Sequence, residues 1–189
     1  SPLVRASLIQ LIGADWIGDP AVYELCLHGV GAEDAGIRLA SMNALAGKAD
    51  IERDDIVLGA FSARLADSEI NVRAAAIPAL ISSGDFHYLA PAVQQLSLWL
   101  SDEKDASRRK LGLQVLVKVK NERLIQTLVR YLRDNDPSVR ACAVELIDDI
   151  SAQATSREIK GQGLDILQTL LGDQDSSVRL AAVAGLSHF

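Results

Sequence analysis

The chain has 189 residues, of which 49% are hydrophobic and only 4% aromatic, and its net charge at pH 7 is −6. This length allows one large domain or an extended array, and the acidic balance argues against a general nucleic-acid binder. No apolar run approaches the roughly 18 residues that a membrane-spanning helix needs, and no basic segment precedes an apolar stretch as in a signal peptide.

Apolar residues at helical spacing predict a helix near the start of the chain, with Leu8 and Ile12 on one face. Further helices are predicted around residues 23–30, 37–45, 56–65, 72–80, 89–100, 109–116, 124–132, 139–147, 159–170 and after 179. Asp19-Pro20 is typical of a helix start. Pro78 lies within a predicted helix and should bend it or weaken one backbone hydrogen bond. The sequence has no sustained alternation typical of strands.

One turn recurs between these helices. The segment Asp134-Asn-Asp-Pro-Ser-Val-Arg140 combines turn and cap residues with a proline suited to the first helical turn, and similar segments occupy residues 67–73 and 173–179. Related arginines follow one another at intervals of 31 to 39 residues, at Arg5, Arg38, Arg73, Arg109, Arg140 and Arg179. Arg108 would fit the fourth turn by its spacing from Asp102, but Arg109 gives the better helical register. Repeated helical units indicate a solenoid, which usually presents a binding surface.

The turn pattern Asp-x-(Asp)-x-x-Val-Arg-x-x-Ala resembles the HEAT-repeat family, including its short phycobilisome-lyase-like repeats. This resemblance covers essentially the whole chain and implies an all-α fold, a right-handed α-solenoid of stacked antiparallel helix pairs with about five and a half repeats. We expect a single domain over residues 1–189. Because the first residues match the second helix of a repeat, we also expect the chain to be a fragment of a longer protein.

The resemblance also assigns roles to the turn residues. In HEAT proteins the aspartate and arginine of each turn form ladders between adjacent repeats. Carried over to this sequence, that structural role falls on Asp67 with Arg73, Asp134 with Arg140, and Asp173 with Arg179. A guanidinium can satisfy helix-end carbonyls and a carboxylate together, so a structural role is favoured over phosphate binding. The first two units depart from the pattern, because Arg5 has no visible aspartate and Asp34 is closer to Arg38 than usual.

The sequence offers little chemistry for catalysis. His28, His87 and His188 fall in three different units, and none has a Glu or Cys at metal-ligand spacing. Asp148 and Asp149 are adjacent on a predicted helix and point in different directions, so they do not form a catalytic dyad. We therefore expect no enzyme activity, no metal and no cofactor. A chromophore-lyase-like HEAT subunit is the enzymatic alternative, and bilin binding would reveal it.

The two cysteines indicate a compartment. Cys26 and Cys142 lie in different units within helical patterns, which predicts two buried, unpaired thiols. Unpaired thiols fit a reducing environment, so we expect an intracellular, cytoplasmic protein without membrane association.

Charge and register suggest where a partner would bind. Residues 104–133 hold nine basic and two acidic residues, a net charge of +7 in an acidic chain. This basic window, residues 104–133, has two interpretations. It is either a solvent-exposed helix face or a surface that binds an acidic peptide segment of another protein. The candidate partner-binding residues are Lys110, Gln114, Lys118, Lys120 and Arg123. Nucleic acid is disfavoured, since Tyr131 is the only aromatic residue of the window.

The position five residues after each arginine indicates the inner surface of the solenoid. It is occupied by Gln10, Asn43, Pro78, Gln114, Glu145 and Ala184, a mostly polar column that we expect to face solvent. The sequence as a whole predicts a non-catalytic protein–protein interaction scaffold within a larger protein or complex. A helical-repeat nucleic-acid binder is a further alternative, which titration with duplex DNA would test.

Overall fold

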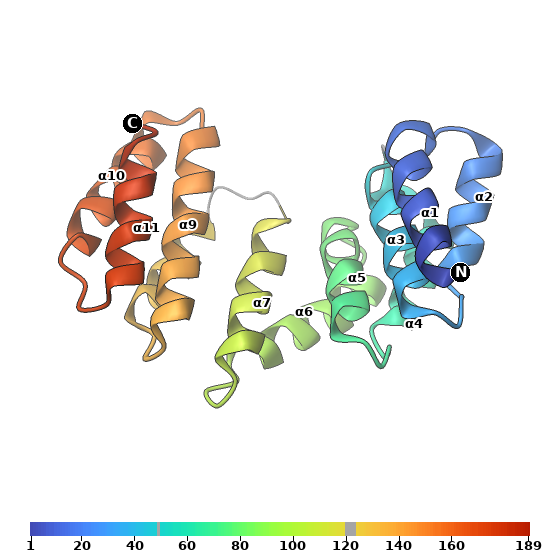
Figure 1. Cartoon of the computed structure of the whole chain (residues 1–189), viewed down its shortest axis with the longest axis horizontal. Helices are drawn as coiled ribbons and strands as arrows, with labels where there is room; N and C mark the ends of the chain where they lie inside the picture. The colour runs from blue at the N-terminus through green and yellow to red at the C-terminus, as the bar shows by residue number, and fades with distance from the viewer. Residues whose placement is uncertain (49, 120–123) are drawn as a thin grey trace. The chain divides into compact units, whose positions relative to one another are not determined.

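The computed structural model describes residues 1–48, 50–119 and 124–189, and these are helical and free of strands, as predicted (Figure 1). The α-helices are α1 (Pro2–Trp16), α2 (Pro20–Gly29), α3 (Ala35–Ala46), α4 (Asp55–Arg64), α5 (Ile70–Ser82), α6 (Phe86–Leu100), α7 (Ala106–Val117), α8 (Leu124–Val129), α9 (Pro137–Gln153), α10 (Arg157–Leu170) and α11 (Ser176–Leu186). Two short 3₁₀ helices, η1 (Ile51–Arg53) and η2 (Arg130–Arg133), precede α4 and follow α8.

Aspartates set the starts of the helices. The side chains of Asp19, Asp34, Asp105, Asp136 and Asp175 each accept hydrogen bonds from backbone N–H groups in the first turn of α2, α3, α7, α9 and α11. These caps satisfy donors that a helix start leaves without a partner. Proline occupies the first position of α2 and α9, where no backbone N–H is needed. The turn chemistry expected from the sequence is therefore present.

The chain forms two compact units, Ser1–Ser97 and Leu98–Phe189. In the first unit α3 packs on α1, α2 and α5, and α4 packs on α5. Its core is made of fully buried side chains from these helices, including Met42, Leu45, Phe61, Ile77 and Leu80. The helix α5 continues through Pro78. That the two units belong to one domain over residues 1–189 stays a prediction.

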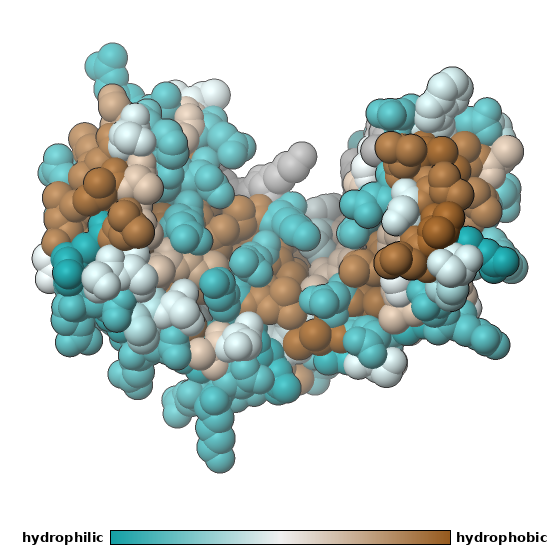
Figure 2. Space-filling view, viewed as in Figure 1, coloured by the Kyte–Doolittle hydropathy of each residue, from teal (hydrophilic) through white to brown (hydrophobic). Residues whose placement is uncertain are grey.

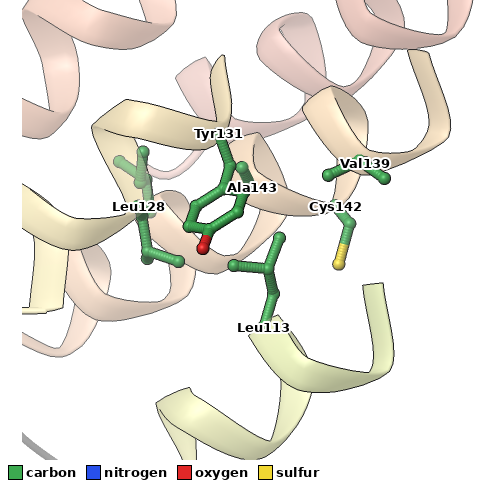
Figure 3. Close-up of a cluster of buried hydrophobic side chains, with 7 residues drawn as sticks. Leu113, Leu128, Tyr131, Val139, Cys142 and Ala143 are labelled. Atoms are coloured by element: carbon green, nitrogen blue, oxygen red, sulfur yellow. The ribbon is translucent and has the colours of Figure 1, made fainter. Parts of the chain in front are cut away.

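In the second unit α9 is central, since it packs on α7, α8, α10 and α11. Figure 3 shows how successive repeats share one core: Leu113 of α7 points toward Leu128, Tyr131 and Cys142. A second cluster joins Val144 of α9 to the two helices that follow it. Trp99 is buried, as its sequence neighbours suggest. Each repeat thus buries its apolar face on its neighbours, as in other solenoids.

Several glycines allow helices to come unusually close, and two of them face a serine. A Cβ atom on Gly29 of α2 would lie 2.0 Å from the Ser41 hydroxyl of α3, and one on Gly163 of α10 would lie 2.0 Å from the Ser151 hydroxyl of α9. Real Cβ atoms essentially never come this close, so a larger residue at either place would force the serine or the helix to move. A glycine therefore faces a serine between α2 and α3 in the first unit and between α10 and α9 in the second.

Some apolar side chains remain exposed in both units. Figure 2 shows an apolar patch over α1, where Leu3, Val4, Leu8 and Leu11 are each more than half exposed. In α11, Leu180 and Val183 are also more than half exposed. Among the described residues, no helix combines the length and the apolar character that a membrane span requires.

Candidate functional site

The turns between repeats contain paired arginines and aspartates. Arg38 donates from Nε to Asp67 Oδ2 at 2.8 Å and from Nη2 to Asp67 Oδ1 at 2.7 Å. Its remaining terminal nitrogen donates to the backbone carbonyls of Ala32 and Glu33. The guanidinium therefore closes its own turn and also holds the carboxylate of the next turn.

The second unit repeats this arrangement twice. Arg109 binds Asp134 through two hydrogen bonds of 2.7 and 2.8 Å, and Arg140 binds Asp173 through two of 2.8 and 3.0 Å. Arg109, and not Arg108, therefore occupies the position chosen from helical register. We call the three pairs, Arg38–Asp67, Arg109–Asp134 and Arg140–Asp173, the arginine ladder.

The arginine and aspartate of the same turn meet through the backbone. Arg73 donates to the carbonyl oxygens of Asp67 and Ser68, Arg140 to that of Asp134, and Arg179 to those of Asp173 and Gln174. The carboxylates of Asp67, Asp134 and Asp173 face the arginine of the preceding repeat instead. The sequence pattern locates these residues but does not reveal which oxygen each guanidinium binds.

The ladder has clear electrostatic consequences. The Arg38 guanidinium lowers the pKa of the Asp67 carboxyl below its ordinary value, and Arg140 does the same for Asp173. The hydrogen bonds that the two arginines donate to these carboxylates in turn raise the pKa of both guanidinium groups. Because each guanidinium already binds a carboxylate and a carbonyl, the ladder arginines suit stacking of repeats better than binding of an added anion.

A second network lies at the start of α4. Asp54 caps this helix, accepts a hydrogen bond from Tyr23 at 3.1 Å, and pairs with Lys48 at 2.6 Å. Burial opposes the charge of Asp54, but the bonds from Lys48, the Val57 backbone and Tyr23 outweigh it and lower its pKa. Sequence reasoning missed this network, because its members are far apart in the chain and follow no repeated spacing.

A groove of about 570 Å³ runs along the second helices of the C-terminal unit. Its lining comes from Lys110 of α7, from Ser138, Ala141, Cys142, Glu145, Asp148 and Asp149 of α9, and from Ser177, Leu180, Ala181, Ala184 and Gly185 of α11. We call it the second-helix groove. Most of these side chains are short, and Figure 1 shows α9 and α11 side by side along its length.

The polar column expected from the sequence faces solvent. Gln10, Asn43, Gln114, Glu145 and Ala184 are exposed, and Pro78 is half-buried. Glu145 and Ala184 line the second-helix groove. The helical register therefore located part of the groove, but the contribution of Asp148, Asp149 and Leu180 required the structure.

The candidate basic residues are only partly brought together. Lys110 is half-buried in the groove wall, Gln114 is exposed one turn further along α7, and Lys118 is exposed just beyond that helix. Lys120 and Arg123 lie outside the described residues. Of the candidate residues that the structure describes, Lys110 alone lines the groove.

The groove lining includes a cysteine, Cys142. Burial raises the pKa of its thiol to about 11, so it is protonated at neutral pH and suited to packing. Cys26 is also free and buried.

Within residues 1–48, 50–119 and 124–189, no three His, Cys, Asp or Glu side chains are grouped to hold a metal ion. His188 contacts Asp148, whereas Asp149 is exposed.

Comparison with known families agrees with the repeat architecture. A family described as HEAT repeats matches residues 93–187, and one described as HEAT repeat associated with sister chromatid cohesion matches residues 47–80. The chain belongs to the HEAT-repeat family. HEAT repeats form scaffolds that generally act in protein interactions, and such repeat folds are typical of non-catalytic proteins.

Several solved structures resemble this HEAT-repeat chain in fold. An engineered protein, Northeast Structural Genomics Consortium target OR329, is 20% identical with a TM-score of 0.48, covering 97% of this chain and 87% of that one. A second engineered target, OR497, is 21% identical with a TM-score of 0.47, and this chain spans 53% of its length while 97% of this chain is covered. A designed armadillo repeat protein in complex with the peptide (KR)4 is 17% identical with a TM-score of 0.48, covering 97% of this chain and 91% of that one. No curated protein matches the sequence.

Proposed function

We propose that this chain is a non-catalytic protein-interaction module within a larger protein or complex, and that the second-helix groove binds an extended segment of another protein. The observation that carries the proposal is the groove itself, about 570 Å³ in volume and lined by short side chains on three helices. Concave surfaces along the helices of a solenoid are suited to long, shallow contacts with a partner chain.

The lining suits a peptide backbone and its side chains. Glu145 and the hydroxyls of Ser138 and Ser177 offer hydrogen-bonding groups, and the exposed amide of Gln114 lies further along α7. Leu180 is 70% exposed and gives an apolar contact for a partner side chain. This mixture of polar and apolar groups is common in specific binding sites.

The basic cluster in residues 104–133 suggests which part of the partner segment would lie at the α7 edge. Lys110 and Lys118 would face an acidic part of the partner segment at the α7 edge. The basic window continues in the sequence with Lys120 and Arg123. Changing Lys118, Lys120 and Arg123 to Glu should weaken binding and flatten its dependence on salt, because local charge steers an oppositely charged partner. Circular dichroism should show unchanged helicity. Equal affinity of both proteins at low salt would contradict this part of the proposal.

A blocked groove provides the main test. Ala184 is exposed in the groove, so Ala184→Trp should fill it without disturbing the core, whereas Ala152→Trp places the same side chain on α9 outside the groove. An array of synthetic 12-residue peptides should bind the unmodified protein and the Ala152 variant, but not the Ala184 variant. An array without binding, or binding unaffected by Ala184→Trp, would overturn the proposal. Tight binding of duplex DNA at moderate salt would favour the nucleic-acid alternative.

A further inference from the structure

The charges that line the second-helix groove are unevenly distributed. Of its twelve lining residues, Glu145, Asp148 and Asp149 are acidic and only Lys110 is basic. All three carboxylates belong to α9, whereas the lysine belongs to α7 at the edge. The centre of the groove therefore attracts positive charge, even though its α7 edge is basic.

Asp148 differs from the other two acidic residues because it is buried. Only 7% of its surface is exposed, whereas Glu145 and Asp149 are exposed. Its Oδ2 atom lies 2.9 Å from Nδ1 of His188. Its Oδ1 atom is buried and has no hydrogen-bond donor within the described residues. A buried carboxylate oxygen without a donor is unfavourable, so a donor supplied by a ligand would be bound strongly.

The carboxyl group of Asp148 packs against the backbone of Gly185, a position without a side chain. A Cβ atom on Gly185 of α11 would lie 3.1 Å from Cγ of Asp148 and 3.0 Å from a methyl group of Leu167. A larger residue at position 185 would thus press on the carboxyl group. His188, the only described partner of the carboxylate, has a side chain that is 55% exposed and can turn away into solvent. Asp148 itself lines the groove, so its carboxyl group borders the space that a partner side chain would fill.

We propose that Asp148 binds an arginine side chain of the partner segment, with Glu145 and Asp149 contributing to the same negatively charged site. A guanidinium fits because it always carries its charge and presents several N–H donors in one plane, which can reach Oδ1 and an exposed carboxylate together. This inference rests on the proposed function, since it names the chemistry of one residue in the segment bound by the groove. The segment therefore combines an arginine over α9 with acidic residues toward α7.

Three fluorescently labelled decapeptides test the inference. In each peptide alanine alternates with one other residue, which is arginine in the first, glutamine in the second and glutamate in the third. The arginine peptide should bind most tightly in fluorescence anisotropy titrations. Asp148→Asn should weaken its binding about tenfold, because a charge-assisted hydrogen bond becomes a neutral one. Asp165→Asn makes the same change at an exposed position of α10 outside the groove, and it should leave the affinity unchanged. The arginine peptide's affinity should fall as salt rises.

The possible outcomes separate the inference from the proposed function. Unchanged affinity in Asp148→Asn, or equal binding of the glutamine and arginine peptides, overturns the arginine site, while the peptide array still supports the groove. If neither the decapeptides nor the array shows binding, the proposed function fails as well. Should Asp148→Asn fail to fold, the exposed double change Glu145→Gln with Asp149→Asn decides. It should weaken binding of the arginine peptide about threefold to tenfold, and unchanged affinity would overturn the inference.

Discussion

Arg140 shows how one side chain serves two repeats. It is 5% exposed, donates to the carbonyls of Asp134 and Asn135 in its own turn, and holds Asp173 of the next turn with two hydrogen bonds. The arginine ladder therefore combines the satisfaction of backbone acceptors with a contact between repeats.

Replacing this arginine should be costly. Arg140→Ala should destabilise the fold by about 3–5 kcal/mol, because it leaves the largely buried carboxylate of Asp173 without its partner. Arg130→Ala removes an exposed arginine from η2 and should cost only about 0–1 kcal/mol. Free energies of unfolding from urea melts provide the comparison. Similar losses in the two variants would be inconsistent with a structural role for the ladder.

The ladder should also make the fold sensitive to acid. Since the pKa values of Asp67 and Asp173 are lowered in the folded state, their stabilising contribution is complete above about pH 5. As pH falls below about 4, the unfolded chain takes up protons that the folded chain does not, and stability is lost. Urea melts between pH 2.5 and 6 should show this slope, and Asp67→Asn or Arg38→Gln should flatten it. An unchanged slope in both variants would contradict the assignment.

The ladder expected from the sequence overlaps only in part with the pairs in the structure. Arg38 and Arg109 were not among the expected ladder residues, and the hydrogen bonds described for Arg73 and Arg179 go to backbone carbonyls. A repeated turn marks Asp134, Arg140 and Asp173 because the same residue types recur at the same places. A guanidinium has donors on two sides, however, and only the stacked backbone decides which oxygen each donor meets. The turn of Arg38 departs from the sequence pattern, yet Arg38 forms a pair with Asp67 because the stacked backbone brings the two side chains together.

Close helix pairs depend on small residues in the same way in both units. Gly163→Ala should destabilise the fold by about 1–3 kcal/mol, because its new methyl group would collide with Ser151 and force α10 away from α9. Gly161 lies in the same helix with nothing within 4 Å, so Gly161→Ala should instead stabilise by about 0.5–1 kcal/mol.

Thermal melts of both variants test the difference. Combining Gly163→Ala with Ser151→Gly should recover part of the loss, since it moves the bulk from one helix to the other. If Gly163→Ala were as stable as Gly161→Ala, the two helices could not be as close as 2.0 Å implies.

Helix starts were easier to predict than helix contacts. Asp19, Asp34 and Asp136 cap helices as their sequence neighbours indicate, because capping is a local interaction. The contact of Gly29 with Ser41 depends on how two helices cross, and neither residue is unusual in its own helix.

Core substitutions in the two units should have local effects. Leu80→Ala should cost about 2–5 kcal/mol, because Leu80 is fully buried in the first unit, and Val144→Ala in the second should cost less. Since each repeat contacts only its neighbours, native-state hydrogen exchange should show lost protection in α3–α5 for Leu80→Ala and in α9–α11 for Val144→Ala. Equal loss over the whole chain in either variant would indicate one cooperative structure.

At the scale of the whole molecule, the sequence predicted the repeats and the exposed column but not the second-helix groove. Helical register places Glu145 and Ala184 on the solvent side without regard to neighbours. The burial of Asp148 depends on the absence of a side chain at Gly185, which lies in another repeat. Such features arise from the fit between repeats, for which residue spacing along one helix carries no information.

The arginine ladder affects where the gene can gain or lose codons without loss of the fold. The two residues of a pair are separated by 29, 25 and 33 positions in the three cases, yet all three pairs have nearly the same hydrogen-bond lengths. Between them lies the first helix of the following repeat, which has 6 residues in α8 and 14 in α10. Codons gained or lost in that helix leave both ends of the pair in place. Insertions and deletions should therefore accumulate in the first helices as related genes diverge, while the distance from each arginine to the turn before it, 6 or 7 residues in the three ladder arginines, varies much less.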